Sequence, residues 1–132
     1  MPKKTKSLSK LKKEIDKYFS LYIRLRHASK DGIIKCFTCD KTGHYKKGFH
    51  AGHFQSRRFL PTRWNEDNVQ NQCVKCNLYS QGEQYKFSQN LGEEKSKELQ
   101  TLARSTIKFM RHEYEELLQT YKEKVKNLTN DS

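Results

Sequence analysis

Four cysteines fall into two closely spaced pairs. Cys36 and Cys39 form one C-x2-C unit, and Cys73 and Cys76 form a second one 33 residues further along. A pair with this spacing in a turn, or at the start of a helix, directs two sulfur atoms toward one point, so two pairs can surround a tetrahedral zinc ion. Disulfides or a redox pair are the alternatives, but two spaced pairs with no leftover cysteine favour zinc. Because all four ligand positions would be filled, we expect the zinc to be structural and not catalytic.

Polar residues capable of catalysis lie between and just after these pairs. The segments are Ala51-Gly-His-Phe54, Asp67-Asn-Val69 and Gln72-Cys-Val-Lys-Cys-Asn77. A single histidine or asparagine would be unremarkable, since asparagines favour loops and histidines are common at surfaces. In this order, and interleaved with the cysteines, the residues form a far more specific pattern.

This pattern resembles the HNH, or His-Me finger, nucleases, and in particular the phage NinG/Rap family of recombination endonucleases, which cut branched DNA. In HNH nucleases a strand histidine, a loop asparagine and a helix histidine or asparagine surround one divalent cation beside a treble-clef zinc site. The resemblance covers most of the chain from about residue 11. It rests on Ala51–Phe54, Trp64–Val69, Gln72–Asn77, Gly82, Tyr85 and the helical stretch Tyr18–Arg26.

The resemblance implies an α+β fold, with a small treble-clef ββα-metal core that holds a structural zinc ion. Helices flank this core at both ends of the chain. We expect a basic arm over residues 1–10, followed by a single HNH nuclease domain over residues 11–132. The expected parts of that domain are an N-terminal helix at 11–31, the zinc and ββα-metal core at 33–82, and a helical part at 83–128.

The resemblance also implies roles for three residues. His53 matches the strand histidine and would be the general base, because neutral imidazole accepts a proton near pH 7. Asn68 matches the middle asparagine, which holds the base in position. Asn77 matches the third position, where an oxygen ligand holds the catalytic Mg²⁺ or Mn²⁺.

One position departs from the family pattern. Many relatives carry an Asp or His immediately before the base as a second metal ligand, and here that residue is Gly52. His50 has the same strand parity but lies about 6.6 Å further along, a gap that a bulge at Gly52 would close. His50 is therefore a second candidate ligand of the catalytic cation, with Asp67 and Glu66 as competitors.

Basic residues indicate a nucleic-acid partner. The net charge is +12; residues 1–30 carry ten Lys and Arg against two acids, whereas residues 81–132 carry nine of each. Such a surplus suits a polyanion, because binding releases counterions from phosphates. A basic solvated tail is the alternative. The expected DNA-binding residues are Arg57, Arg58 and Arg63 near the site and Lys10, Lys12 and Lys13 on the first helix.

Helical spacing of apolar residues marks both ends of the chain. A helix is predicted from Leu8, capped by Ser7 or Ser9 and ending before Gly32, and another near residues 83–91 that Gly92 ends. A longer helix over 107–128, capped by Ser105 or Thr106, is expected to pack on the first helix. Residues 33–72 favour short strands and loops, with Trp64 as a core anchor.

Composition excludes a large apolar core, since only 33% of the 132 residues are hydrophobic and 32% are charged. The chain lacks an apolar run that would span a membrane and the apolar stretch of a signal peptide. We therefore expect a cytoplasmic protein, in the host cell if phage-encoded.

The predicted function is a metal-dependent endonuclease that acts on branched or recombination-intermediate DNA such as Holliday junctions and flaps. The alternatives are a zinc-stabilised nucleic-acid-binding module without catalysis and an HNH nickase without branch preference. Binding alone requires neither His53 nor Asn77, whereas the nuclease requires both. A homodimer and recombination proteins as partners are compatible with the sequence.

Overall fold

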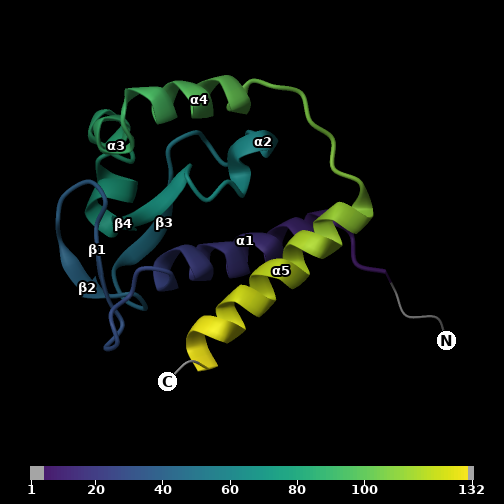
Figure 1. The fold of residues 1–132 in the computed structure, drawn as a ribbon, viewed down its shortest axis with the longest axis horizontal. Helices are drawn as coiled ribbons and strands as arrows, with labels where there is room; N and C mark the ends of the chain where they lie inside the picture. The colour runs from purple at the N-terminus through teal and green to yellow at the C-terminus, as the bar shows by residue number, and fades with distance from the viewer. Residues whose placement is uncertain (1–4, 131–132) are drawn as a thin grey trace.

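Helices and two short antiparallel strand pairs build the fold in the computed structural model, which describes residues 5–130 (Figure 1). The helices are α1 (Leu8–Leu25), α2 (Leu60–Arg63), the π-type helix η1 (Lys75–Tyr79), α3 (Gln84–Leu91), α4 (Glu93–Ala103) and α5 (Arg111–Asn130). The strands are β1 (Ile33–Lys35), β2 (Thr42–His44), β3 (Phe49–His53) and β4 (Val69–Cys73). The mixed α+β class predicted from the sequence is confirmed.

Helix α1 begins where the sequence predicts. The Ser7 side chain accepts a hydrogen bond from the backbone N–H of Lys10, which caps the first turn. The helix ends at Leu25 and not near residue 31, because residues 26–32 form turns that close at Gly32, whose φ is +80°. Residues 8–10 therefore belong to the helix and not to the expected arm, and residues 1–4 of that arm lie outside the described part of the chain.

The first and last helices pack side by side along one edge of the molecule (Figure 1). They run in the same direction, since the Arg111 side chain donates to the backbone of Lys6 while the Tyr121 ring lies edge-on to Phe19, with centroids 4.9 Å apart. The apolar residues of α1, three and four apart, are buried against α5. The predicted packing of the two terminal helices is confirmed, and Trp64 is buried in the same cluster.

The sequence prediction places the start of the last helix too early. Residues 105–110 are not helical, and α5 begins at Arg111. Figure 1 shows why: α4 and α5 lie on different sides of the molecule, so this segment must cross between them. Neither Ser105 nor Thr106 caps α5. The side chain of Glu113 instead accepts a hydrogen bond from the backbone N–H of Met110.

The two strand pairs are regular antiparallel ladders. In the second pair, Phe49 lies opposite Cys73 and His53 opposite Val69, with every intermediate residue paired in register. The bulge that would have moved His50 toward the position of Gly52 is therefore absent from β3. Within residues 5–130, every helix is too short or too polar to cross a lipid bilayer.

Three small clusters of buried apolar side chains replace one large core. The first joins α1, α5 and the loop that carries Trp64, the second surrounds the cysteines, and the third lies where Phe54 meets α3 and α4. The second cluster contains Ile34 and Phe49 together with three cysteines. This division agrees with the low apolar content of the sequence.

Candidate functional site

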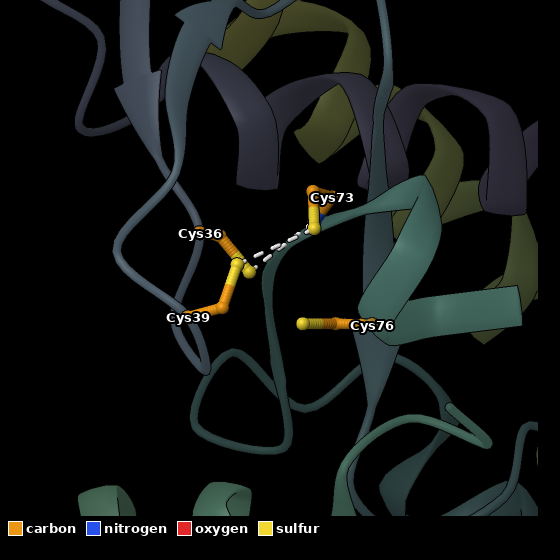
Figure 2. Close-up of side chains that lie close together, drawn as sticks. All are labelled: Cys36, Cys39, Cys73 and Cys76. Carbon is orange, nitrogen blue, oxygen red and sulfur yellow. Dashed lines mark hydrogen bonds between the residues drawn. The ribbon is translucent and has the colours of Figure 1, made fainter. Parts of the chain in front are cut away.

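The four cysteines come together from two segments of the chain (Figure 2). Cys36 and Cys39 lie on the loop between β1 and β2, Cys73 ends β4, and Cys76 lies in η1. Their sulfur atoms all lie within 4.8 Å of one another, and the Cys39 and Cys73 sulfurs are 3.5 Å apart. Zinc–sulfur bonds of about 2.3 Å in a tetrahedron would place the sulfurs about 3.8 Å apart. The cluster could therefore hold a zinc ion.

The pKa values of two of these thiols also agree with a site that binds a cation. Burial opposes ionisation of Cys36, but the backbone N–H of Cys73 and the hydroxyl of Thr38 lower its pKa to about 6. Burial and the neighbouring thiols raise the pKa of Cys76 to about 12. One thiolate is thus prepared by hydrogen bonds, while the last one requires a positive charge to form. A zinc ion held by the four sulfurs would supply that charge.

Gln72 explains why glycine precedes the candidate base. Its buried side chain donates to the Thr38 hydroxyl at 3.1 Å and to the Gly82 carbonyl at 2.7 Å, so it links the cysteine loop to the turn after η1. A Cβ atom at position 52 would lie 1.8 Å from the Gln72 amide oxygen. An Asp or His ligand at this position therefore has no room in this chain.

His53 lies in a pocket of about 610 Å³ between α1, the end of β3 and η1. Asp16, Asn77 and Arg57 are among the other residues that line it. The Nε2 atom of His53 is 3.0 Å from the backbone carbonyl oxygen of Arg63. A carbonyl oxygen can only accept, so the proton of the neutral imidazole is on Nε2 and the lone pair is on Nδ1. The second ring nitrogen is thus set up to accept a proton.

The surroundings of His53 favour its neutral form. Burial lowers the pKa of His53 below the usual 6.5, and the positive charge of Arg57 acts in the same direction. The backbone carbonyls of Arg63 and Ala51 and the carboxylate of Asp16 oppose this shift in the pKa of His53, and they do not outweigh it. His53 therefore has the protonation state that a general base requires near neutral pH.

Asn68 is fully buried and acts on the loop after β3. Its amide oxygen accepts from the Gln55 N–H at 2.7 Å, and its amide nitrogen donates to the carbonyls of Gln55 and Thr62. Among the hydrogen bonds of residues 5–130, none joins Asn68 to His53. Any effect of Asn68 on the base therefore passes through the loop that ends in the Arg63 carbonyl.

Asn77 lines the pocket, and its amide nitrogen is 3.0 Å from Nδ1 of His50. The structure thus brings the two candidate cation ligands together, although His50 does not line the pocket. The two competing acids are engaged elsewhere: Glu66 accepts from Tyr121 and Lys124, and Asp67 pairs with Lys95. In the described chain, the cysteines are the one group of three or more His, Cys, Asp or Glu side chains close enough to share a metal ion.

The sequence prediction missed Asp16, which reaches the pocket from α1. Its carboxylate accepts two hydrogen bonds from Arg63, at 3.1 and 2.6 Å, and one from the Trp64 indole at 2.9 Å. The sequence does hold one indication of this role, because Asp16 and Glu14 are the two acids among the ten Lys and Arg of the first 30 residues. An acid on such a basic helix suggests a specific ion-pair partner.

The predicted DNA-binding residues differ in how accessible they are. Arg57 is exposed and lines the pocket, and Arg58 is exposed with its guanidinium over the Phe59 ring. Arg63 is engaged by Asp16 and only 20% exposed, and its role as a phosphate clamp stays a prediction. Lys10 and Lys13 are exposed on α1, whereas the ammonium of Lys12 lies over the Tyr114 ring.

Comparison with known proteins adds a family to this geometry. No curated protein and no solved structure matches the chain. A family model described as "Bacteriophage Lambda NinG protein" matches residues 2–131, which is nearly the whole chain. The protein therefore belongs to the family of the bacteriophage lambda NinG protein.

Proposed function

We propose that this protein is a metal-dependent DNA endonuclease of the HNH, or His-Me finger, type that cuts branched or recombination-intermediate DNA. The observation that carries the proposal is the state of His53. Burial lowers its pKa and so favours the neutral form, the Arg63 carbonyl accepts from its Nε2–H, and it lies in a pocket that Asn77 and Arg57 also line, so Nδ1 is the nitrogen that would take the proton. A module that only binds nucleic acid has no use for such a histidine.

The local fold supports this class of enzyme. In this proposal the β3–β4 pair and η1 would be the two strands and helix of a ββα-metal unit, with His53 on a strand and Asn77 on the helix. The cysteine cluster at one end would be a treble-clef zinc site. Four protein ligands would leave no open position on the zinc, so its role is to fix the geometry of β4 and η1.

The chemistry of phosphodiester hydrolysis fits the residues in the pocket. Nδ1 of His53 takes a proton from water as the water oxygen forms a bond to phosphorus, and the bond from phosphorus to the 3′ oxygen breaks on the opposite side. The exposed guanidinium of Arg57 binds a phosphate oxygen and holds the strand in line. The leaving 3′ oxygen takes a proton from a solvent water molecule, and His53 returns its own proton to solvent, so the products are a 5′ phosphate and a 3′ hydroxyl group.

Asn77 would hold a Mg²⁺ or Mn²⁺ ion through its amide oxygen, with His50 beside it. An amide oxygen suits these hard cations, which also take ligands from substrate phosphate and water. When bound, such a cation stabilises the negative charge that develops on the phosphate and the leaving oxygen. Because the Asn77 amide carries no charge, the charge of a bound cation would remain available to the phosphate.

The partner proposed is DNA, and the evidence for it is charge. The +12 net charge is concentrated in the part of the chain that contains α1 and the pocket. Because the chain belongs to the NinG family, we also propose a preference for branched DNA, recombination proteins as partners, and action in the cytoplasm of the host cell. A homodimer would allow paired cuts across a junction.

The test compares the wild type with His53→Ala on labelled linear duplex, flap and four-way junction DNA, with Mg²⁺, Mn²⁺ or EDTA. His112→Ala is the matched control, since His112 is an exposed histidine on α5. We expect metal-dependent cutting, strongest on branched DNA, that His53→Ala abolishes and His112→Ala retains. Zinc content is measured after EDTA, so that loss of zinc is distinguished from loss of the catalytic cation.

Three results would contradict the proposal. Equal cutting by His53→Ala and wild type would remove His53 as the base. Binding of DNA without cutting any substrate under any condition would favour a zinc-stabilised binding module, and equal cutting of linear and branched DNA would favour a nickase without branch preference.

A further inference from the structure

We propose that Asp16 is a positioning residue for the base, and that it acts by fixing the backbone carbonyl of Arg63 that holds Nε2–H of His53. The proposal rests on the proposed function, in which His53 takes the proton from water. It assigns a role in the site to Asp16 of α1, which lies outside the ββα unit and before Tyr18–Arg26, the stretch of the first helix on which the family resemblance rests.

The link from Asp16 to His53 is short and direct. Nε and one terminal nitrogen of the Arg63 guanidinium donate to the two oxygens of the Asp16 carboxylate, in the paired geometry that gives arginine and carboxylate their strongest contacts. The Trp64 indole adds a third hydrogen bond to the same carboxylate. The carbonyl that contacts His53 belongs to Arg63 itself. Asp16 therefore holds two consecutive side chains on either side of the peptide group that orients the base.

Helix α2 requires such an external support. It has four residues, and a helix of one turn has little stability of its own because nucleation is costly. Arg63 is its last residue, and no side chain caps its first turn. Asn68 holds the Thr62 carbonyl from inside the molecule, and Asp16 holds Arg63 and Trp64 from α1. The orienting carbonyl is thus fixed by two contacts from outside the short helix.

The packing of α1 limits the motion of Asp16. Its helix neighbour Ile15 is fully buried, and Phe19, one turn later, is buried between α1 and α5. The side chains of Asp16 and Arg63 are only 18% and 20% exposed, so the ion pair is partly shielded from water and salt. Both carboxylate oxygens accept hydrogen bonds from Arg63 or Trp64, and one of them also lies 3.9 Å from the exposed Arg57 guanidinium, so Asp16 is occupied by contacts within the chain.

The test is Asp16→Asn in the full zinc-loaded protein, read by the tautomer of His53 in nitrogen-15 NMR. An asparagine can still accept from Trp64 but has no charge to hold Arg63. We expect the wild type to show Nε2–H at His53, and the variant to show a mixture of the Nε2–H and Nδ1–H forms. The His53 signals are assigned by their loss in His53→Ala.

Kinetics supply a second measurement. A base that is poorly oriented slows the chemical step but does not weaken DNA binding, so Asp16→Asn is expected to lower kcat by about 10- to 100-fold with little change in KM. Arg63→Lys keeps a backbone carbonyl at position 63 but removes the paired contact that fixes its position, and it is expected to give the same tautomer mixture. The double variant should be no worse than either single variant, because both remove one link.

Glu14→Gln is the matched control. Glu14 lies on the same helix, removes the same charge when substituted, and is paired with Lys6 away from the pocket. It should keep the wild-type tautomer and kcat. If Asp16→Asn loses zinc or helix content, Arg63→Lys, which leaves α1 unchanged, decides the question.

A single Nε2–H form with wild-type kcat in both Asp16→Asn and Arg63→Lys would overturn the proposal. The tautomer is measured without DNA, so it tests the link even if the wild-type protein cuts no DNA. In that case the proposed nuclease function fails, while a tautomer mixture in the variants would still show that Asp16 orients His53.

Discussion

At the scale of single residues, local sequence reveals the candidate base but not what orients it. His53 and Asn77 stand at fixed distances from the cysteines, so a short pattern is enough to find them. Asp16 and Arg63 are 47 positions apart, and they meet only because α1 packs across the end of β3. The same packing occupies Arg63, which the sequence alone could only describe as a basic residue near the site. Pairings of this kind depend on tertiary structure, and residue spacing does not predict them.

The buried position of His53 leads to a prediction for the pH dependence of cutting. A general base acts in its neutral form, so kcat/KM rises with pH through the pKa of His53 and levels off above it. Since burial places that pKa below 6.5, activity should be near its plateau at pH 7 and should fall only at pH values under 6.5. The measurement is kcat/KM on junction DNA from pH 5 to 8, with zinc content followed at each pH. An acidic limb with its midpoint above 6.5 would contradict the burial argument.

At the scale of elements, the sequence predicts those whose signals are local. Ser7 caps α1 and Gly92 ends α3, and both helices appear where these residues place them. The start of α5 is predicted too early because Ile107 continues the apolar spacing, although it is exposed in the structure. The need to cross from α4 to α1 overrides the local pattern at residues 105–110. The regular register at Gly52 also depends on a partner in another strand, the side chain of Gln72.

The contact between Gly52 and Gln72 predicts that Gly52→Ala is destabilising. The added methyl group must displace the Gln72 amide and break its bonds to Thr38 and Gly82, at a cost of about 1–3 kcal/mol in unfolding free energy. Urea unfolding of the zinc-loaded protein measures this cost. In a Gln72→Ala background the same substitution should cost much less, because the clashing side chain is gone. An equal cost in both backgrounds would mean that Gln72 is not the obstacle.

At the scale of the whole molecule, the low apolar content and the four cysteines belong together. The apolar side chains form three separate clusters, and the one around the cysteines contains few large residues. A metal that joins β4 and η1 to the β1–β2 loop would supply the cohesion that this part of the core lacks, because zinc binding contributes directly to folding. The composition predicted a small apolar core supplemented by a metal site, whereas the position of each apolar cluster could be found only from the fold.

Zinc removal is therefore expected to unfold the region around β3, β4 and η1. Elemental analysis of protein purified without chelator should give about one zinc ion per chain, and a strong chelator should abolish cooperative thermal unfolding. Restoring zinc should restore the transition, and adding Mg²⁺ should not. Cys76→Ser should behave like the chelated protein. A chelated protein with an unchanged unfolding transition would contradict a structural role for the cluster.

The positive net charge of the molecule leads to a prediction about how α1 contacts DNA. Deleting residues 1–10 would remove the Ser7 cap and the first turn of α1, so substitution of exposed lysines is the cleaner test. Lys10 and Lys13 are exposed on α1, on a helix whose opposite face is buried. If both contact phosphates, Lys10→Gln/Lys13→Gln should weaken binding and reduce the slope of log Kd against log salt by about 1.8.

The control for this pair removes the same charge from the neutral C-terminal third. Lys108 and Lys126 are exposed there, and Lys108→Gln/Lys126→Gln should leave the salt slope close to that of the wild type. Net charge acts through the general field, and this effect would be equal in the two double variants. A slope that falls by the same amount in both would therefore show that α1 contributes charge alone. A fall confined to Lys10 and Lys13 would show that this helix contacts the DNA next to the pocket that holds His53.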